Sequence, residues 1–303
     1  MTKKNENKKT VAEIVTQRFI DALNTGRVPW VRPWESWASW SRLTGNDYQG
    51  ANQLTLSGGE YITFKQAKEQ GIEIKKGAKA EMIVKYTEYM KTYTAEQWET
   101  EQAYHAMDIA TGKVEYLEGG KVKAPARSIR YYNVFNVETC TNAEMKHDKK
   151  QKRHEWDAIE KAEQIASEYI QREGLKVTEA SNQPCYKPGA HEIETGRKEQ
   201  FTSPEAYYST MFHEMVHSTM KTLKREIGNY SGNKKARARE ELVAEIGAAY
   251  IMSYLGIESG FTVENSNAYV KSWAENLKND PNAILWAAPK AIAAANLILN
   301  IEQ

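Results

Sequence analysis

The sequence predicts an α+β protein of two domains, a mixed front half and a mainly helical back half with a small sheet. Its 303 residues are enough for two cores of ordinary size, and 41% of them are hydrophobic. Segments rich in β-branched and aromatic residues gather in the front half, whereas amphipathic helical patterns dominate the back half. The run over 143–155 is highly charged and lacks an apolar face. We therefore expect domains over 10–142 and 156–303, joined by a linker over 143–155 and preceded by a flexible basic arm over 1–9.

The front half is expected to begin with a helix and to end in strands. Apolar side chains recur at helical spacing from Val11 to Leu23, with Thr10 as the N-cap and Gly26 just past the end. The next stretch contains several Pro and Gly residues and no regular period, which is typical of an ordered loop. A short helix is then expected over 61–71. Strands are expected over 80–90 and 128–140, with a hairpin or insertion between them over 91–126.

The back half is expected to consist of helices around a few short strands. An amphipathic segment runs from Trp156 to Gly174, which is a suitable C′ glycine, and short strands and turns follow over 176–198. Further helices are predicted at about 203–222, 235–256 and 265–278, with a last one after Pro281.

Composition limits the possible classes of protein. No run of about 18 apolar residues is present, and no apolar segment of the secretory type follows the charged N-terminus, so we expect a cytoplasmic protein without a membrane partner. The two cysteines, Cys140 and Cys185, lie far apart and are expected to be free thiols. Residues 1–154 contain 25 Lys or Arg against 19 Asp or Glu. This mild basic excess permits a polyanionic partner without requiring one.

The segment "AYYSTMFHEMVHSTM" contains the pattern His-Glu-x-x-His. On an α-helix, His213 and His217 lie one turn apart on one face, so both rings can direct a nitrogen at one metal ion. Glu214 lies on an adjacent strip, where its carboxylate can reach a metal-bound water as a general base. Apolar neighbours indicate partial burial, in which imidazole is neutral. The pattern predicts a zinc site, and manganese, cobalt or nickel could use the same ligands in vitro.

A catalytic zinc site needs a third protein ligand. The helix predicted over 235–256 carries Glu241 and Glu245 on one face, which resembles the gluzincins, where a glutamate ligand is followed by an acid that orients a histidine. We expect Glu241 to be the ligand and Glu245 the orienting acid, with the reverse assignment as the alternative. Glu240 fits a solvated helix start. His191 is a rival ligand, but a surface histidine is the more ordinary explanation.

Several motifs in order resemble the ArdC-type antirestriction proteins of plasmids, phages and conjugative elements. In the back half, "AYYSTMFHEMVHSTMKTLKR" and "AREELVAEIGAAYIMSYLGI" are similar to the zincin-type peptidase domain of that family. In the front half, "VTQRFIDALNTGRVPWVRPW", "YQGANQLTL", "YITFKQAKEQGIEIKKGAKAEMIVKY" and "RYYNVFNVE" are similar to its N-terminal domain, which is associated with single-stranded DNA binding. The chain departs from the family in a longer segment over 91–125 and in Pro289 and Lys290, where many relatives carry a histidine.

The resemblance implies a mobile-element protein that binds single-stranded DNA and protects incoming DNA from host restriction. Its peptidase domain would hold zinc, and proteins bound to DNA would be among its possible substrates. Two alternatives stay open: a DNA-binding protein whose metal site is structural or vestigial, and a freestanding zinc metallopeptidase without a nucleic-acid partner. Glu214 favours a competent centre, because a purely structural site would not need it.

Candidate DNA contacts lie in three places in the front half. Four tryptophans fall within eleven residues and are interleaved with arginines. Rings that stack on bases, beside guanidinium groups that bind phosphates, are typical of single-strand binding, although a Pro-Trp pair more often anchors a loop. Lysines near a glycine turn and a strand with two tyrosines supply further candidates. The predicted contacts are Arg27, Arg32, Trp37, Trp40, Arg42, Lys75, Lys76, Lys79, Arg130 and Tyr132.

Overall fold

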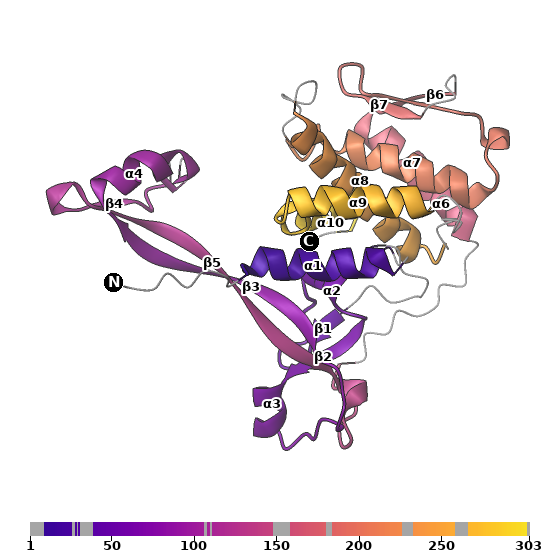
Figure 1. The fold of residues 1–303 in the computed structure, drawn as a ribbon. Coiled ribbons are helices and arrows are strands. Elements are labelled where there is room, and N and C mark those ends of the chain that lie inside the picture. The colour runs from indigo at the N-terminus through magenta and orange to yellow at the C-terminus, as the bar shows by residue number, and fades with distance from the viewer. Residues whose placement is uncertain are drawn as a thin grey trace. The chain divides into compact units, whose positions relative to one another are not determined.

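The protein is an α+β protein, as the sequence predicts, and its contacts divide it into two compact units (Figure 1). Unit 1 joins Met1–Glu81 to Val134–Gln303, and unit 2 comprises Met82–Asn133. The predicted linker over 143–155 lies mostly outside the described residues, so the predicted domain boundary stays a prediction. The computed structural model describes residues 9–25, 28, 30, 39–105, 108–109, 111–147, 158–179, 184–225, 233–257 and 266–301.

Unit 1 begins with a capped amphipathic helix, α1 (Val11–Asn24). The hydroxyl of Thr10 accepts a hydrogen bond from the Glu13 amide at 3.2 Å, and the Glu13 carboxylate accepts one from the Thr10 amide at 2.6 Å. This reciprocal capping box confirms Thr10 as the N-cap. The chain then forms four short elements, which are β1 (Ser39–Ser41), α2 (Ala51–Thr55), β2 (Gly59–Thr63) and α3 (Phe64–Glu69).

A strand precedes α3 where the sequence predicts a single helix over 61–71. Tyr61 and Ile62 are each 1% exposed and pair with β5, so this part of the prediction is wrong. Thr63 ends the strand and caps α3, because its hydroxyl accepts a hydrogen bond from the Gln66 amide at 3.2 Å. The segment begins with the aromatic Tyr61 and the β-branched Ile62, which favour a strand, and the capping box of Thr63 and Gln66 then starts the helix.

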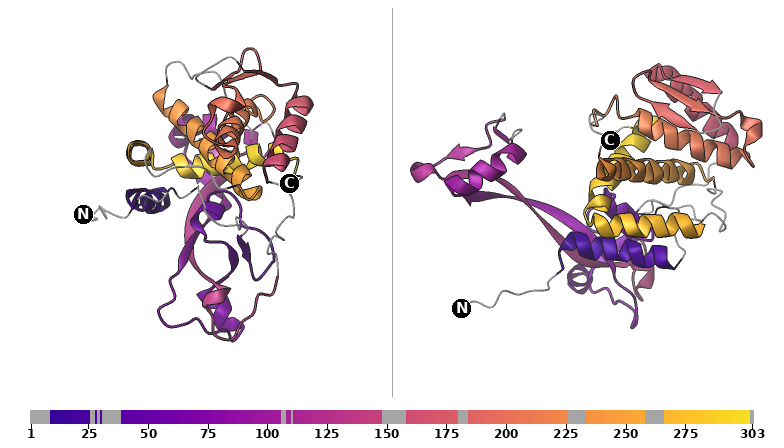
Figure 2. Two further views of the ribbon diagram at one scale, coloured as in Figure 1. Left: turned by 90° about the vertical axis from the view of Figure 1, so that its right-hand side faces the viewer. Right: turned by 45° about the horizontal axis from the view of Figure 1, so that its top comes forward.

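The larger sheet has the strand order β1-β2-β5-β3, and β4 (Glu115–Tyr116) pairs with β5. β1 is parallel to β2, which is antiparallel to β5. The long strands β3 (Glu81–Tyr93) and β5 (Val122–Asn136) form a twisted ribbon, and most of it belongs to unit 2 (Figures 1 and 2). Short 3₁₀ turns lie at Gln102–His105, Glu118–Gly120, Val137–Thr139 and Lys198–Gln200.

The tip of unit 2 corresponds to the hairpin or insertion expected over 91–126. It contains α4 (Ala95–Glu101) and β4, and it has a small core of its own. Tyr93, Trp98 and His105 contact one another through their rings, with centroids 5.3–5.7 Å apart. Aromatic contacts of this kind stabilise a short segment that buries little other apolar surface.

The back part of unit 1 is mainly helical, as predicted. A three-stranded sheet has the order β6-β8-β7, in which β6 is parallel and β7 antiparallel to β8. Its strands and the helices around it are α6 (Ala158–Glu173), β6 (Lys176–Glu179), β7 (Cys185–Lys187), β8 (Glu192–Thr195), α7 (Pro204–Ser218), α8 (Lys234–Tyr254), α9 (Ser266–Asn279) and α10 (Ala283–Leu299).

α8 packs closely against both α7 and α10, which positions the candidate site. Small side chains permit this approach, because Gly247 faces Val216 of α7 and the Ala291 carbonyl of α10. The alanines of α10 share this tight interface and are fully buried at Ala287, Ala288, Ala291, Ala294 and Ala295. Close backbone approach therefore depends on the absence of a side chain at Gly247.

Gly247→Val is expected to lower the free energy of unfolding by about 1–3 kcal/mol. A β-carbon at this position would lie 2.8 Å from Cγ2 of Val216 and 3.4 Å from the Ala291 oxygen, so α8 would have to move away from its neighbours. Urea unfolding of the full chain measures the loss. Gly189→Val is the matched control, since a β-carbon there would meet no atom within 4 Å. Equal losses in both variants would contradict this account.

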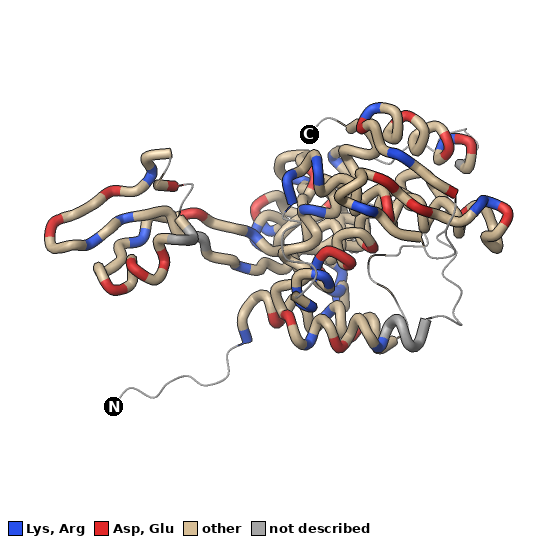
Figure 3. The backbone as a smooth tube through the Cα atoms, turned by 90° about the horizontal axis from the view of Figure 1, so that it is seen from above, with Lys and Arg blue, Asp and Glu red and all other residues tan. Residues whose placement is uncertain are grey.

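α1 belongs to the same unit as the C-terminal helices. Trp30 is fully buried and contacts Phe19 of α1 and Trp273 of α9, with ring centroids 6.5 and 5.8 Å apart. The Thr16 hydroxyl donates a hydrogen bond to the Pro281 carbonyl at 2.6 Å. Lys and Arg are interspersed with Asp and Glu along the described part of the chain (Figure 3). In the described part, no single helix is long and apolar enough to cross a membrane; only Lys271–Asn279 with Ala283–Leu299, bent by 111°, passes that test as a pair.

Candidate metal centre

α7 presents the two histidines of the motif. Ser203 caps the helix by accepting a hydrogen bond from the Ala206 amide at 3.2 Å, and Pro204 suits its first turn. Packing of α7 against α8 brings His213 and His217 next to the acidic start of α8. The apolar side chains that fix the helix are each 3% exposed or less, namely Met211, Phe212, Met215 and Val216.

Three side chains converge between α7 and α8. The Nε2 atoms of His213 and His217 lie 3.2 Å apart, and Oε2 of Glu241 lies 3.5 Å from the first and 3.7 Å from the second. Bonds of ~2.0–2.1 Å at tetrahedral angles place ligand atoms ~3.3 Å apart. The three atoms therefore have the spacing and the chemistry of a ligand set for a divalent metal ion. The Glu241 side chain is 45% exposed, which leaves access for a further ligand.

Each histidine has a second carboxylate beside the other ring nitrogen. Oε1 of Glu245 lies 3.9 Å from Nδ1 of His213, and Oε1 of Glu240 lies 3.5 Å from Nδ1 of His217. A carboxylate in this position holds the ring and favours the tautomer that leaves Nε2 free for a metal. The sequence predicts Glu245 in this position, but not Glu240.

Glu240 is 1% exposed, so its assignment to a solvated helix start is wrong. Its carboxylate accepts two hydrogen bonds from the buried Arg225, at 2.8 and 3.3 Å, and Arg225 also donates to the Thr219 hydroxyl at 2.6 Å. The helical period contains a signal for this burial. Glu240 shares a face with Val243 and Ala244, which are both fully buried.

The electrostatics of the cluster favour a shared cation. Burial lowers the pKa of His217, but hydrogen bonds with Glu240 and Glu241 outweigh burial and raise that pKa to about 9. Hydrogen bonds with the two histidines hold the pKa of Glu241 well below its ordinary value. Burial raises the pKa of Glu240, yet hydrogen bonds from His217 and Arg225 lower it overall. The carboxylates of Glu240 and Glu241 are therefore charged at neutral pH. A proton on His217 or a metal ion at the cluster can balance this negative charge.

Glu214 is 7% exposed and stands outside the three-atom cluster. Its helix packs against β7 and β8. Burial, Glu194 and then Glu214 raise the pKa of the Cys185 thiol on β7, so the Glu214 carboxylate lies on the side of the small sheet. Among the described residues, no hydrogen bond to this carboxylate is found. Although the residue is largely buried, its carboxylate oxygens are accessible to water, as a general base for a water molecule requires.

His191, the rival ligand, has other partners. Its Nδ1 lies 2.9 Å from the Tyr186 hydroxyl, and its Nε2 lies 3.2 Å from the Glu173 carbonyl oxygen. The residue is 9% exposed and has a positive φ of 48° in the turn before β8. Because both ring nitrogens have partners, His191 is a buried structural residue; it is not part of the cluster, and the expectation of a surface histidine is wrong.

Two of the predicted DNA contacts are structural residues. Trp40 on β1 is 1% exposed, so its indole cannot stack on a base. The Arg42 side chain is 13% exposed, and its Nη1 lies 2.6 Å from Oε2 of the fully buried Glu60 side chain. The predictions for Trp40 and Arg42 are therefore wrong, because both side chains pack into the core around β1 and β2. Outside the described residues lie Arg27, Arg32 and Trp37.

The other predicted contacts are exposed. Lys75, Lys76 and Lys79 follow α3, and Arg130 and Tyr132 lie on β5. The sequence does not reveal that the middle of the ribbon also exposes other large side chains. These are Tyr86 (52%), Tyr89 (48%), Met90 (47%) and Tyr131 (48%). The weak signal is a strand pattern that lacks the alternation of a half-buried strand over 85–90.

Comparisons with known proteins cover both halves of the chain. Residues 9–137 match the N-terminal domain of the anti-restriction factor ArdC, and residues 163–290 match a zincin-like metallopeptidase. Two Escherichia coli proteins called DNA primase TraC are 29% and 32% identical to the chain over 98% of it, but the chain spans only 20% and 28% of their lengths.

The fold also matches crystal structures of the antirestriction protein ArdC of plasmid R388. The metal-free structure has a TM-score of 0.66 and 26% identity, covering 97% of this chain and 99% of the other. The Mn(II)-bound structure has a TM-score of 0.65 and 25% identity, covering 97% of this chain and 98% of the other. With both domains matched in order, the chain belongs to the ArdC-type proteins, in which an ArdC N-terminal domain precedes a zincin-like metallopeptidase domain.

Proposed function

We propose that this chain is an antirestriction protein of a mobile element that acts in the cytoplasm, binds single-stranded DNA and protects incoming DNA from host restriction. Its front half would bind the DNA, and its back half would hold a zinc-dependent peptidase-type centre. The observation that carries the proposal is the convergence of His213, His217 and Glu241 beside the buried Glu214, in a chain whose front half matches the ArdC N-terminal domain.

The donor set suits zinc, which takes imidazole and carboxylate ligands in tetrahedral coordination. Manganese is the alternative, because the R388 relative has a Mn(II)-bound form. A divalent metal held here would supply a Lewis acid and lower the pKa of a bound water. In this proposal Glu214 takes the proton of the attacking water and passes it to the leaving amine. Glu245 and Glu240 hold the two imidazoles in orientation.

An extended polypeptide is the substrate class that fits this centre. β7 lies at one edge of the small sheet and packs against α7, near Glu214. The edge of a sheet binds an extended peptide through backbone hydrogen bonds. The proposed targets are proteins bound to the DNA, because the front half would bring the centre to them.

DNA binding is proposed for the exposed middle of the β3-β5 ribbon. Tyrosine rings that project from a ribbon can stack on successive bases, whatever the sequence, and nearby cations bind the phosphates. The chain also matches segments of two proteins called DNA primases, which supports a DNA partner. The ribbon carries Tyr86, Tyr89, Tyr131, Tyr132, Lys85 and Arg130, all exposed. Lys75, Lys76 and Lys79 are proposed as separate phosphate contacts, and Arg27, Arg32 and Trp37 stay predicted contacts.

Tyr132→Ala is expected to weaken binding of a fluorescent single-stranded oligonucleotide by about tenfold, because base stacking on one ring is worth ~1–3 kcal/mol. The Tyr132 side chain is 41% exposed, so its removal should leave the free energy of unfolding nearly unchanged. Fluorescence anisotropy with the full chain, at two salt concentrations and with duplex competitor, measures the affinity.

Tyr132→Phe is the matched variant, since it keeps the ring and loses only the hydroxyl. It should bind like the unchanged chain. Wild-type binding should also weaken steeply as salt rises, because phosphate contacts release counterions. If the full chain binds single strands no better than duplex, the DNA-protecting function is wrong. If it prefers single strands and Tyr132→Ala binds them equally well, the ribbon is not the binding surface.

A further inference from the structure

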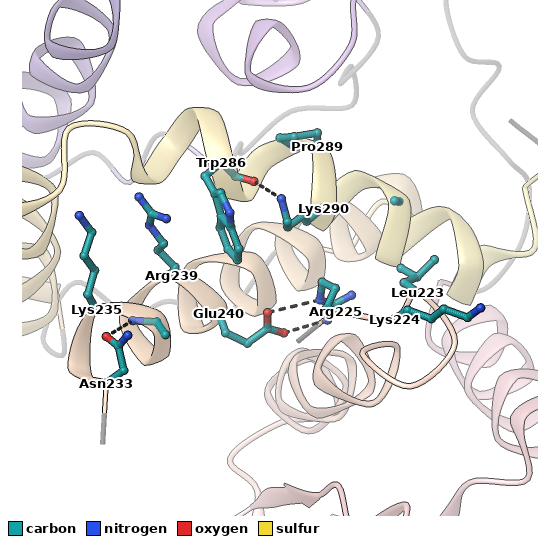
Figure 4. A pocket seen from close by; sticks show the side chains of 12 residues that line it. Leu223, Lys224, Arg225, Asn233, Lys235, Arg239, Glu240, Trp286, Pro289 and Lys290 are labelled. Atoms are coloured by element: carbon teal, nitrogen blue, oxygen red, sulfur yellow. Dashed lines mark hydrogen bonds and ion pairs between the residues drawn. The ribbon is translucent and has the colours of Figure 1, made fainter. Parts of the chain in front are cut away.

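A cavity lies beside the metal centre. Glu240 forms part of its wall and also faces His217 of the metal centre. The cavity is about 800 Å³ in volume and lies between the turns that follow α7, the start of α8 and the middle of α10 (Figure 4). This volume is within the range of small-molecule sites, ~300–1,000 Å³. Part of its wall is apolar or uncharged, made of Leu223, Asn233, Ala236, Trp286, Pro289 and Ala293.

The rest of the wall is strongly basic. Five cationic side chains line the pocket, namely Lys224, Arg225, Lys235, Arg239 and Lys290. Two carboxylates are paired with them. Glu240 accepts from Arg225 at 2.8 Å, whereas Asp280 lies 2.5 Å from Arg239 and 3.3 Å from Lys235. Among the described residues around this cavity, five positive charges against these two negative charges leave an excess of three.

Of these cations Lys290, like the exposed Lys224, has no ion pair among the described residues. Its ammonium donates a hydrogen bond to the Trp286 carbonyl at 3.3 Å and lies 4.1 Å from the centre of the indole ring (Figure 4). Within the described part of the chain, no carboxylate lies within ion-pair distance of it. Burial and then the charges of Arg225 and Arg239 lower the pKa of Lys290. An anion in the cavity would relieve this repulsion directly.

The free donors define the chemistry of the ligand. Asp280 occupies Nε and Nη2 of Arg239, which leaves Nη1 outside that ion pair, and the Trp286 ring lies between Arg239 and Lys290 (Figure 4). Trp286 is already contacted by both cations, so its ring offers little surface for stacking on a base. A tetrahedral dianion matches an excess of three positive charges better than a singly charged carboxylate or phosphodiester. The apolar wall can contact the organic part of the same ligand.

We propose that this pocket binds the dianionic phosphate of a small phosphomonoester of about mononucleotide size, with Lys290 as the main phosphate contact. The site is separate from the metal cluster, and it would exist whether or not the protein is a peptidase. Arg225 contributes to both sites, because it lines the pocket and forms an ion pair with Glu240, whose carboxylate faces His217. For this reason the test leaves Arg225 and Glu240 unchanged.

Isothermal titration calorimetry of the full chain with adenosine 5′-monophosphate tests the proposal. Inorganic phosphate, adenosine and a single-stranded oligonucleotide with a 5′-hydroxyl are the comparison probes. Lys290→Gln should weaken monophosphate binding by about tenfold, the effect of one charge-assisted contact. Lys235→Gln, a second variant at an exposed position of the same pocket, should weaken it less. Lys161→Gln on the exposed face of α6 is the matched control and should bind like the unchanged chain.

Inorganic phosphate should compete for the site, and adenosine should not. No binding of the monophosphate at millimolar concentration would overturn the proposal. So would equal binding by wild type, Lys290→Gln and Lys235→Gln. If only the oligonucleotide binds in a way that needs Lys290, the pocket takes a DNA phosphodiester and the small-molecule assignment is wrong.

Discussion

Glu214→Gln is expected to lower the rate of polypeptide hydrolysis by about 10²–10⁴-fold, the usual contribution of a general base. Glutamine keeps the size of the side chain but cannot accept the proton. The metal should stay bound, because Glu214 stands outside the cluster of His213, His217 and Glu241. Cleavage of a fluorogenic unfolded protein substrate, together with the metal content of the purified variant, measures both effects. Glu205→Gln, on the first turn of the same helix, is the matched control.

The same variant separates the two proposed activities in cells. If Glu214→Gln keeps antirestriction while hydrolysis is lost and metal is retained, protection comes from occupancy of the DNA. If both are lost together, protection requires cleavage of a protein. Unchanged hydrolysis with the metal still bound would contradict the role assigned to Glu214. Loss of the metal would instead mean that Glu214 belongs to the ligand set.

Periodicity and spacing predict the helical half of the protein well. His213 and His217 of α7 lie one helical turn apart, as do Glu241 and Glu245 of α8. This spacing depends only on the local helix and not on tertiary contacts. For this reason the amino-acid sequence by itself is enough to pair His213 with His217 and Glu241 with Glu245. Which of the two acids joins the histidines depends on how α7 and α8 pack, so the choice of Glu241 as ligand and Glu245 as orienting acid rests on the resemblance to gluzincins.

Burial is the property that local patterns predict poorly. Trp40 and Arg42 lie in a segment rich in Pro and Gly, which the sequence predicts as a loop. Its pattern does not show that Glu60 is fully buried and needs a cationic partner. Aromatic and basic residues alternate there, and this alternation predicts DNA contacts whether or not the side chains are exposed. The exposed tyrosines of the ribbon show the converse, since only the missing alternation over 85–90 distinguishes Tyr86 from a core tyrosine such as Tyr61. Tertiary contacts decide these cases.

Glu240→Ala is expected to lower the free energy of unfolding by about 3–5 kcal/mol, because it leaves the buried guanidinium of Arg225 without its carboxylate. The same change removes the acid that faces Nδ1 of His217, and loss of such a partner typically lowers metal affinity by about 10–100-fold. Urea unfolding of the metal-free chain measures the first effect, and competition with a chelator indicator at constant pH measures the second.

The two effects of Glu240 can be separated by changing Arg225 as well. In the double variant Glu240→Leu with Arg225→Met no buried charge is left unpaired, so stability should return to within about 1–2 kcal/mol of the original. Metal affinity should stay low, because His217 still lacks its orienting carboxylate. If the double variant recovers both stability and metal affinity, Glu240 serves only to neutralise Arg225, and the orientation of His217 is set by Glu241 and the packing of α7. If Glu240→Ala changes neither property, the buried ion pair contributes nothing that hydration of Arg225 cannot replace.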